Sequence, residues 1–239
     1  AEQSYSQYLA VMGNDTDITI FHGKVVSLFR QEKYAELIQF MLNEKMQRYD
    51  EKISTDLIRL LAFSYARTGQ GAKAYSTFSL IADRVDAVDD IHQLFLLAIA
   101  EKDASNADAY AARLAGTSRY PEAVLALGRF YASFGQPLKA REYFDRITGM
   151  DTPKPVAIDA RKEVARILID DGAASEARDL LIALPPERND SLWNLLYARA
   201  SIDTGRQQEA AAVILPDLKG IARTPGAEQL FTAIAQYLF

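Results

Sequence analysis

Arginine recurs at one place in a repeated local pattern, and its side chain is suited to binding carboxylates. Arg129, Arg166 and Arg199 each follow a small residue inside a similar run of apolar residues. A guanidinium group donates two parallel hydrogen bonds to a carboxylate, which suits recognition of an acidic ligand. These arginines therefore indicate binding rather than catalysis.

Residues that commonly carry catalysis or bind metals are scarce or unsuitably spaced. The two histidines, His22 and His92, do not belong to a metal-ligand spacing such as His-Glu-x-x-His. The chain has no cysteine, no Gly-x-Ser-x-Gly motif and no phosphate-binding glycine loop. The adjacent acids Asp89-Asp90 and Asp170-Asp171 diverge by about 100° on a helix, so neither pair forms a two-carboxylate site. We predict a protein that is not an enzyme and needs no cofactor or metal; a pocket for a small molecule is a third, weaker hypothesis.

Composition excludes several other classes. Of the 239 residues, 49% are hydrophobic and 25% are charged, which is typical of an ordered globular chain. The net charge of -5 argues against nucleic acid as the partner. The longest apolar run, Leu94–Ala100, is far shorter than the roughly 20 residues that span a bilayer, so we expect no direct membrane insertion.

The first residues and the composition bear on localisation. The chain starts with Ala1-Glu2-Gln3, which resembles either a mature end left after signal cleavage or an engineered start. Together with the absence of cysteine and the alanine-rich composition, this start favours a bacterial periplasmic or exported protein over a cytoplasmic one.

Four stretches of the chain share one internal spacing. Each has a large-small pair, a further residue three positions later, a glycine, an alanine and a bulky residue. The glycine ends a first helix in the left-handed conformation, and the alanine lets a second helix approach closely. The stretches are Leu61-Ala62, Tyr65, Gly69, Ala74, Phe78; Leu127-Gly128, Tyr131, Gly135, Ala140, Phe144; Val164-Ala165, Leu168, Gly172, Ala177, Leu181; and Tyr197-Ala198, Ser201, Gly205, Ala210, Ile214.

This pattern resembles the tetratricopeptide repeat family. The resemblance implies an all-α fold, a right-handed superhelix or solenoid of about six helical hairpins that spans 1–239 as one unit. We predict hairpins at 55–88, 121–154, 158–188 and 191–222, degenerate hairpins at 19–50 and 89–117, and a capping helix at 226–238. The hairpin at 89–117 lacks the turn glycine, and Asn106 is expected to cap its second helix.

The resemblance also assigns a face to the arginines, because first helices of this family line a concave groove. Residues one helical turn apart share that face. The predicted groove residues are Arg59, Phe63, Arg67, Leu125, Arg129, Lys162, Arg166, Leu195 and Arg199. The alternative is local pairing, in which Arg166 and Arg199 neutralise Asp170 and Asp203 one turn later.

Two functions follow from this interpretation. The first is an interaction scaffold or adaptor that binds another protein in its groove, by an acidic or C-terminal peptide segment. Some members of the family clamp a terminal carboxylate with lysine, asparagine and arginine, but the asparagines have no counterparts here, so that specificity does not carry over. The second is an assembly module of a bacterial envelope, secretion or pilus complex that acts through its convex face or its ends.

Overall fold

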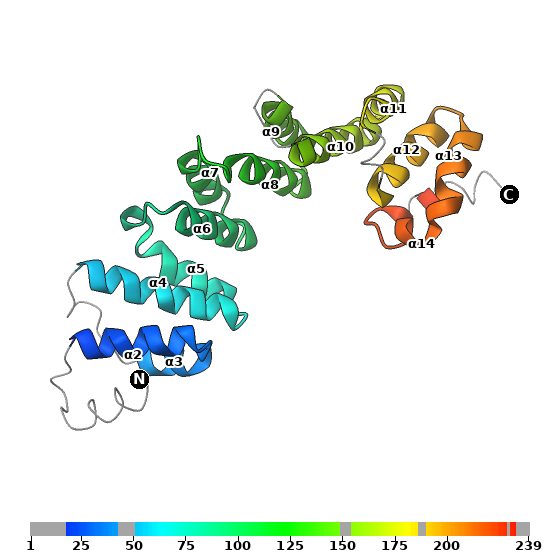
Figure 1. Ribbon diagram of the computed structural model, residues 1–239. Helices are drawn as coiled ribbons and strands as arrows, with labels where there is room; N and C mark the ends of the chain where they lie inside the picture. Colours follow the sequence, from blue (N-terminus) through cyan, green and yellow to red (C-terminus); the bar gives the residue numbers. More distant parts are fainter. Residues whose placement is uncertain (1–17, 43–50, 149–153, 186–189, 229, 233–239) are drawn as a thin grey trace. The chain divides into compact units, whose positions relative to one another are not determined.

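The structure is a computed structural model that describes residues 18–42, 51–148, 154–185, 190–228 and 230–232. Every regular element in these ranges is a helix, and consecutive helices pack in pairs joined by short turns (Figure 1). The pairs are α2 (Ile18–Arg30) with α3 (Tyr34–Met41), α4 (Glu51–Arg67) with α5 (Gly71–Ser79), α6 (Val88–Ala100) with α7 (Ala104–Arg113), α8 (Tyr120–Ser133) with α9 (Pro137–Thr148), α10 (Lys154–Asp170) with α11 (Ala174–Ile182), and α12 (Ser191–Asp203) with α13 (Gln207–Ile214).

We call the helix that begins each pair a first helix and its partner a second helix. The short 3-10 helix η2 (Ala82–Arg84) follows α5, and η4 (Leu215–Asp217) and α14 (Leu218–Ile221) follow α13. Each pair overlaps one predicted hairpin, but α4 and α10 begin at Glu51 and Lys154 instead of at residues 55 and 158. Residues 43–50, 149–153 and 186–188 of the predicted hairpins lie outside the described residues.

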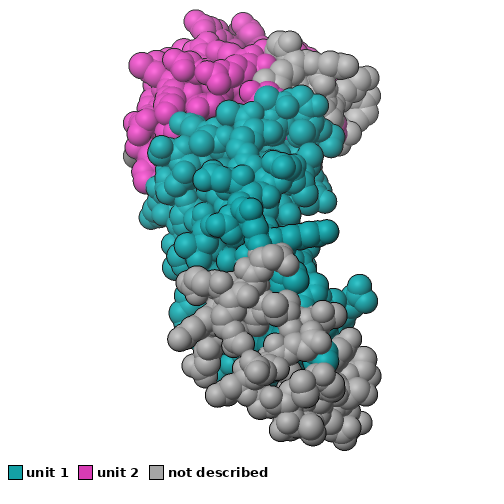
Figure 2. All heavy atoms as spheres, turned by 90° about the vertical axis from the view of Figure 1, so that its left-hand side faces the viewer, with its two compact units in different colours: residues 1–119 teal, residues 120–239 magenta. Residues whose placement is uncertain are grey.

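The chain divides into two compact units, unit 1 (residues 1–119) and unit 2 (residues 120–239), shown in different colours in Figure 2. Within unit 1 the first helix α4 packs against α2, α3 and α5. Within unit 2 the first helix α10 packs against α8, α9, α11 and α12. Each unit is therefore a stack of hairpins, while the single solenoid over 1–239 stays a prediction.

The predicted turn glycines mark the bends between paired helices. Gly69, Gly135, Gly172 and Gly205 have φ values of 75°, 68°, 81° and 75°. This left-handed region is nearly free for glycine and costs other residues about 1–2 kcal/mol. At Gly135 the bend is closed by the amide of the next residue, Gln136, which donates to the carbonyl of Tyr131 at 3.0 Å.

The two degenerate hairpins bend in the same way without glycine. Glu32, between α2 and α3, has a φ of 57°, and Lys102, between α6 and α7, has a φ of 63°. We call these two residues and the four turn glycines the turn residues. The predicted cap at Asn106 is wrong, because the N-cap of α7 is Asp103, whose side chain accepts a hydrogen bond from the Asn106 amide at 3.1 Å.

Small residues at the repeat positions let paired helices approach closely. The alanines that open the second helices are almost fully buried, as are the bulky residues four positions later: Ala74, Ala140, Ala177 and Ala210, then Phe78, Phe144, Leu181 and Ile214. The approach is especially close at Gly128 in α8, where a Cβ atom would lie 2.2 Å from Cε1 of Phe144 in α9. This position therefore needs glycine as long as Phe144 keeps its place.

The last two hairpins of unit 2 are joined through the single tryptophan of the chain. The indole of Trp193 in α12 donates a hydrogen bond to the carbonyl of Leu181 in α11 at 3.0 Å. Its ring also stacks on Tyr197 with 4.7 Å between centroids. Because Trp193 is buried, this bond ties α12 to the preceding second helix.

The start of the predicted capping helix covers the last hairpin. Residues 227, 228 and 230–232 are helical, and the remainder of 226–238 from residue 233, together with residue 229, lies outside the described residues. Ala227 and Leu230 are buried in one cluster with Leu195 of α12 and Ile214 of α13. Burial of this apolar surface closes the end of unit 2.

Candidate functional site

The predicted groove residues occupy three equivalent places on the first helices. They lie ten, six or two residues before the turn residue of their hairpin, so they are one helical turn apart. We call the surface formed by these places the first-helix face. In each unit, the structure brings some of these side chains together and buries others.

In unit 2, two of the predicted arginines share one buried carboxylate that the sequence analysis did not single out. Arg129 Nε of α8 donates to Glu163 Oε1 of α10 at 2.7 Å, and Arg166 of α10 pairs with the other oxygen, Oε2. Glu163 is only 5% exposed, whereas the two arginine side chains are 45% and 41% exposed. A buried carboxylate held between two guanidinium groups fixes the position of both.

Arg199 also pairs with an acid of the neighbouring first helix. Its Nη1 in α12 lies 3.0 Å from Oδ1 of Asp170 in α10. Local pairing therefore occurs, but with partners other than those expected: Arg166 pairs with Glu163 instead of Asp170, and Arg199 pairs with Asp170 instead of Asp203. Arg199 reaches Asp170 because the first helices α10 and α12 pack against each other, whereas Arg166 pairs within α10, with the acid three residues before it.

Three other predicted groove residues of unit 2 are buried. Leu125 and Leu195 are 7% and 4% exposed, so they do not line an open surface. Lys162 is 2% exposed, and its Nζ lies 2.7 Å from Oδ2 of Asp190, the N-cap of α12. Partial burial opposes ionisation of Asp190, but the hydrogen bonds from Lys162 and from the Trp193 amide outweigh it and lower the pKa of this carboxyl.

A cavity of about 600 Å³ lies on the first-helix face of unit 2. Its walls come from α8, the following turn and α10, and they combine the two shared arginines with small and apolar residues. The lining residues include Arg129, Ala132, Arg166, Ile167, Asp170 and Asp171. The two arginines face three carboxylates in this cavity, those of Glu163, Asp170 and Asp171, so the cavity is not cationic.

In unit 1, Arg59 is also paired within the chain. Its Nη2 lies 2.6 Å from Asp56 Oδ1 in the same helix, and its Nη1 lies 3.5 Å from Asp90 Oδ2 in α6. His22 Nε2 of α2 lies 2.6 Å from the other oxygen of Asp56. These contacts link the first helices of three successive hairpins.

The two acids of this network, Asp56 and Asp90, have pKa values shifted in opposite directions. Burial raises the pKa of Asp90, and the charge of Arg59 opposes this only in part. Burial also acts to raise the pKa of Asp56, but the hydrogen bonds with His22 and Arg59 outweigh it and lower the pKa. A second cavity, of about 570 Å³, lies at this network and is lined by residues that include His22, Arg59 and Arg84.

Phe63 and Arg67 of α4 lie on the remaining part of the first-helix face of unit 1. Phe63 is half-buried, with ring centroids 5.4 Å from Phe78 and 6.5 Å from Phe29. Arg67 is exposed and forms no ion pair with the other described residues. This contrasts with the paired arginines of unit 2.

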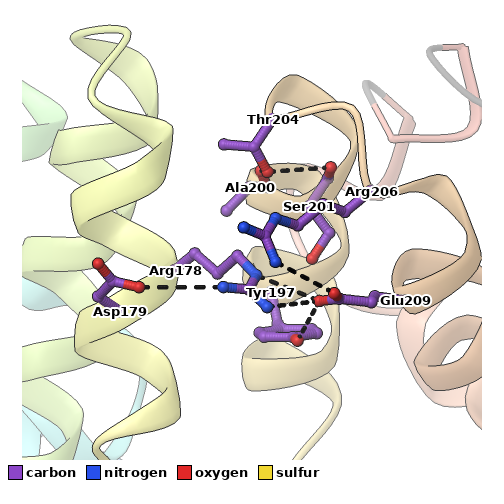
Figure 3. Close-up of polar contacts among 8 residues, drawn as sticks. All are labelled: Arg178, Asp179, Tyr197, Ala200, Ser201, Thr204, Arg206 and Glu209. Carbon is purple, nitrogen blue, oxygen red and sulfur yellow. Dashed lines mark hydrogen bonds and ion pairs between the residues drawn. The ribbon is translucent and has the colours of Figure 1, made fainter.

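The side of unit 2 that carries the second helices holds another ion-pair cluster, which the sequence analysis missed (Figure 3). Arg178 of α11 donates from Nε and Nη2 to Glu209 Oε2 of α13, and the Tyr197 hydroxyl of α12 donates to the same oxygen at 2.8 Å. The hydrogen bonds from Arg178 and Tyr197 lower the pKa of Glu209 to about 2. Because the cluster joins three successive helices, its role is to hold hairpins together.

Across the described ranges, no three His, Asp or Glu side chains are grouped so that they could hold a metal ion. No helix in those ranges is long and apolar enough to cross a membrane. The geometry of the first-helix face is thus one of paired charges, small residues and half-buried apolar side chains.

These observations define the fold class. The described chain is all-α, with tetratricopeptide-like helical hairpins stacked as in a solenoid, and the predicted fold class is confirmed. No protein-family model matches the sequence, and no curated protein matches it.

Two solved structures illustrate the proteins that this chain is similar to. Pseudomonas aeruginosa pilF shares 15% sequence identity, with a TM-score of 0.54 over 90% of this chain and 96% of that one. A tetratricopeptide repeat protein from Parabacteroides merdae shares 13% identity, with a TM-score of 0.48 over 98% of this chain and 90% of that one. At such low identity, the likeness to pilF supports the fold alone.

Proposed function

We propose that this chain is a protein-interaction scaffold that binds a segment of another protein on its first-helix face. One observation carries the proposal: the cavity described in each unit has first helices as its main walls. A face built from repeated helices offers many similar contact points to a bound peptide or helix, which suits recognition of an extended segment.

The paired arginines refine the mode of binding in unit 2. Arg129 and Arg166 each use part of their five donor groups on Glu163, and both side chains remain partly exposed at the cavity. Because Glu163 holds them in place, little side-chain entropy is lost when a partner carboxylate binds them. An acidic or C-terminal peptide segment is the ligand we propose for this cavity.

The alternative function, an assembly module that acts through its convex face or its ends, also has an observation in its favour. Large apolar side chains are exposed on the second-helix side of unit 2: Leu138 in α9 is 79% exposed, Ile182 in α11 is 52% exposed, and Leu215 after α13 is 69% exposed. Exposed apolar groups are common on monomers, so these residues favour the alternative only weakly.

Photo-crosslinking in the native cell separates the two functions. A benzophenone amino acid placed at Leu96 or Ala132 probes the first-helix face, and the same group at Leu138 or Ile182 probes the second helices. The scaffold function predicts protein crosslinks from Leu96 or Ala132. Crosslinks from Leu138 and Ile182 alone would favour the assembly module, and no crosslink from any of the four sites would contradict both.

A further inference from the structure

The first-helix face changes chemical character between the two units. At the place six residues before the turn residue, unit 2 carries three arginines: Arg129, Arg166 and Arg199. Unit 1 carries Val26, Phe63 and Leu96 at the same place, and we call these three residues the apolar row. Equivalent places in one repeat fold have equivalent surroundings, so the difference comes from the sequence and is not imposed by the fold.

The apolar row is partly exposed and supported from below. Leu96 is 40% exposed, and Val26 and Phe63 are half-buried. Val26 packs against the buried cluster that contains Val25 and Leu28, and Phe63 rests on Phe29 and Phe78. A half-buried apolar row on a rigid support loses little entropy when a partner covers it.

Two exposed arginines flank the apolar row. Arg30 and Arg67 lie one helical turn beyond Val26 and Phe63, in the last turns of α2 and α4. In the part of the chain that the structure describes, neither arginine forms an ion pair. The acid nearest to Arg30 in sequence is Glu32, in the turn after α2, and the acid nearest to Arg67 is Asp56 of α4, which pairs with Arg59.

The arginines on the first-helix face of unit 2 lie one turn earlier in their helices, and each already pairs with a carboxylate of the chain. Arg129 and Arg166 are bound to Glu163, and Arg199 is bound to Asp170. Places equivalent to Arg30 and Arg67 hold Ser133, Asp170 and Asp203 in unit 2. Among the described residues, positive charge without an ion-pair partner therefore lies on the first-helix face of unit 1, at the C-terminal ends of α2 and α4.

Charge and apolar character together select one kind of partner. A basic segment would be repelled by Arg30 and Arg67, and a purely apolar segment would remove their guanidinium groups from water without a partner charge. A segment with carboxylates beside apolar side chains satisfies both features. Both arginines also complement the negative ends of their helix dipoles, which is a structural role that a binding experiment must separate.

We propose that the first-helix face of unit 1 binds a protein segment that combines apolar and acidic side chains. Its apolar side chains contact Val26, Phe63 and Leu96, and its carboxylates pair with Arg30 and Arg67. This inference rests on the proposed scaffold function and adds the unit that binds and the chemistry of its ligand.

A defined peptide library tests the inference. The full chain is panned against random 12-residue peptides displayed on phage, and an enriched peptide is then titrated by fluorescence anisotropy. We expect enriched peptides to place Asp or Glu next to Leu, Ile or Phe. Arg67→Glu is expected to weaken binding about tenfold, since it replaces an attraction with a repulsion, and Leu96→Ser about fivefold through lost apolar contact.

Lys73→Glu in α5 is the matched control, because it lies in the same unit, is exposed on a second helix and changes the net charge equally. It should change the affinity less than twofold. Thermal unfolding of all variants, followed by circular dichroism, shows whether a loss of binding comes from a loss of stability. This measurement separates the binding role of Arg67 from its stabilisation of the α4 dipole.

The outcomes are distinct. Enriched peptides that are basic, or that bind equally well to Arg67→Glu and Leu96→Ser, would overturn this inference and leave the scaffold function standing. Failure to enrich any peptide would overturn it as well, because unit 1 then binds no short segment of the proposed chemistry. The scaffold function itself depends on the crosslinks from Leu96 and Ala132.

Discussion

Replacement of Gly128 by alanine should destabilise unit 2, although alanine is the better helix former. A Cβ at this position would lie 2.2 Å from Cε1 of Phe144 and 2.7 Å from both Cδ1 and Cζ, where carbon atoms prefer about 3.5–4.0 Å. Phe144 is fully buried, so its ring has no free space to enter. The substitution therefore forces α8 away from α9.

The magnitude follows from two opposing effects. Overpacking of a core typically costs about 1–3 kcal/mol, and overlap with three ring atoms belongs at the upper end of that range. The change from glycine to alanine inside a helix stabilises the helix by about 1 kcal/mol. We expect a net loss of about 2 kcal/mol. The fold itself should survive, because Ala62 and Phe78 occupy the same two places in the hairpin of α4 and α5.

Urea unfolding followed by circular dichroism measures this loss, and a double-mutant cycle assigns its cause. Phe144→Leu should relieve the clash, since Ala165 and Leu181 are compatible at these places in the next hairpin. The coupling between Gly128→Ala and Phe144→Leu should therefore be at least about 1 kcal/mol. Ala126→Gly, in the same helix, calibrates the propensity effect. A neutral or stabilising Gly128→Ala, or a cycle without coupling, would refute the reasoning.

Two further predictions concern the turns and the ion pairs. Glu32→Gly should stabilise the chain by about 0.5–1 kcal/mol, because glycine adopts the left-handed conformation at this turn without the strain of a side chain. Gly135→Ala should destabilise it by about 1 kcal/mol or more for the opposite reason. Equal urea midpoints for the two variants would contradict this. Glu209 has a folded pKa of about 2 and an ordinary value of 4.5, so its stabilising effect is complete above pH 4.5 and is lost as the pH falls toward 2. Nuclear magnetic resonance titration of Arg178→Met should find the pKa of Glu209 moved up toward 4.5, and an unchanged value would show that Arg178 is not its cause.

The hairpins were predictable from the sequence because their spacing repeats. Gly69 and Gly135 precede Ala74 and Ala140 by the same interval, and both pairs serve the same bend and the same close approach. The bends at Glu32 and Lys102 were not visible as glycines, because a left-handed conformation can be held by other residues when the surrounding helices fix it.

The sequence predicted that the arginines of the site could pair with acids of the chain, but not which acids. The sequence shows that Arg166 and Arg199 have acids one turn away, but the choice of partner depends on how far apart successive first helices lie. Glu163 is three residues before Arg166 and one repeat length after Arg129, and that double proximity is the signal that could have identified it. Its burial, which makes it important, follows only from the packing of α10 between α8 and α12.

The hydrogen bond between Trp193 and Leu181 gives the molecule its own spectroscopic probe. Because the chain has one tryptophan, buried where α11 meets α12, its emission reports the opening of that junction alone. Circular dichroism averages over every helix. A difference between the two unfolding midpoints would therefore show that the hairpins near the C-terminus separate from the stack at a different denaturant concentration from the rest.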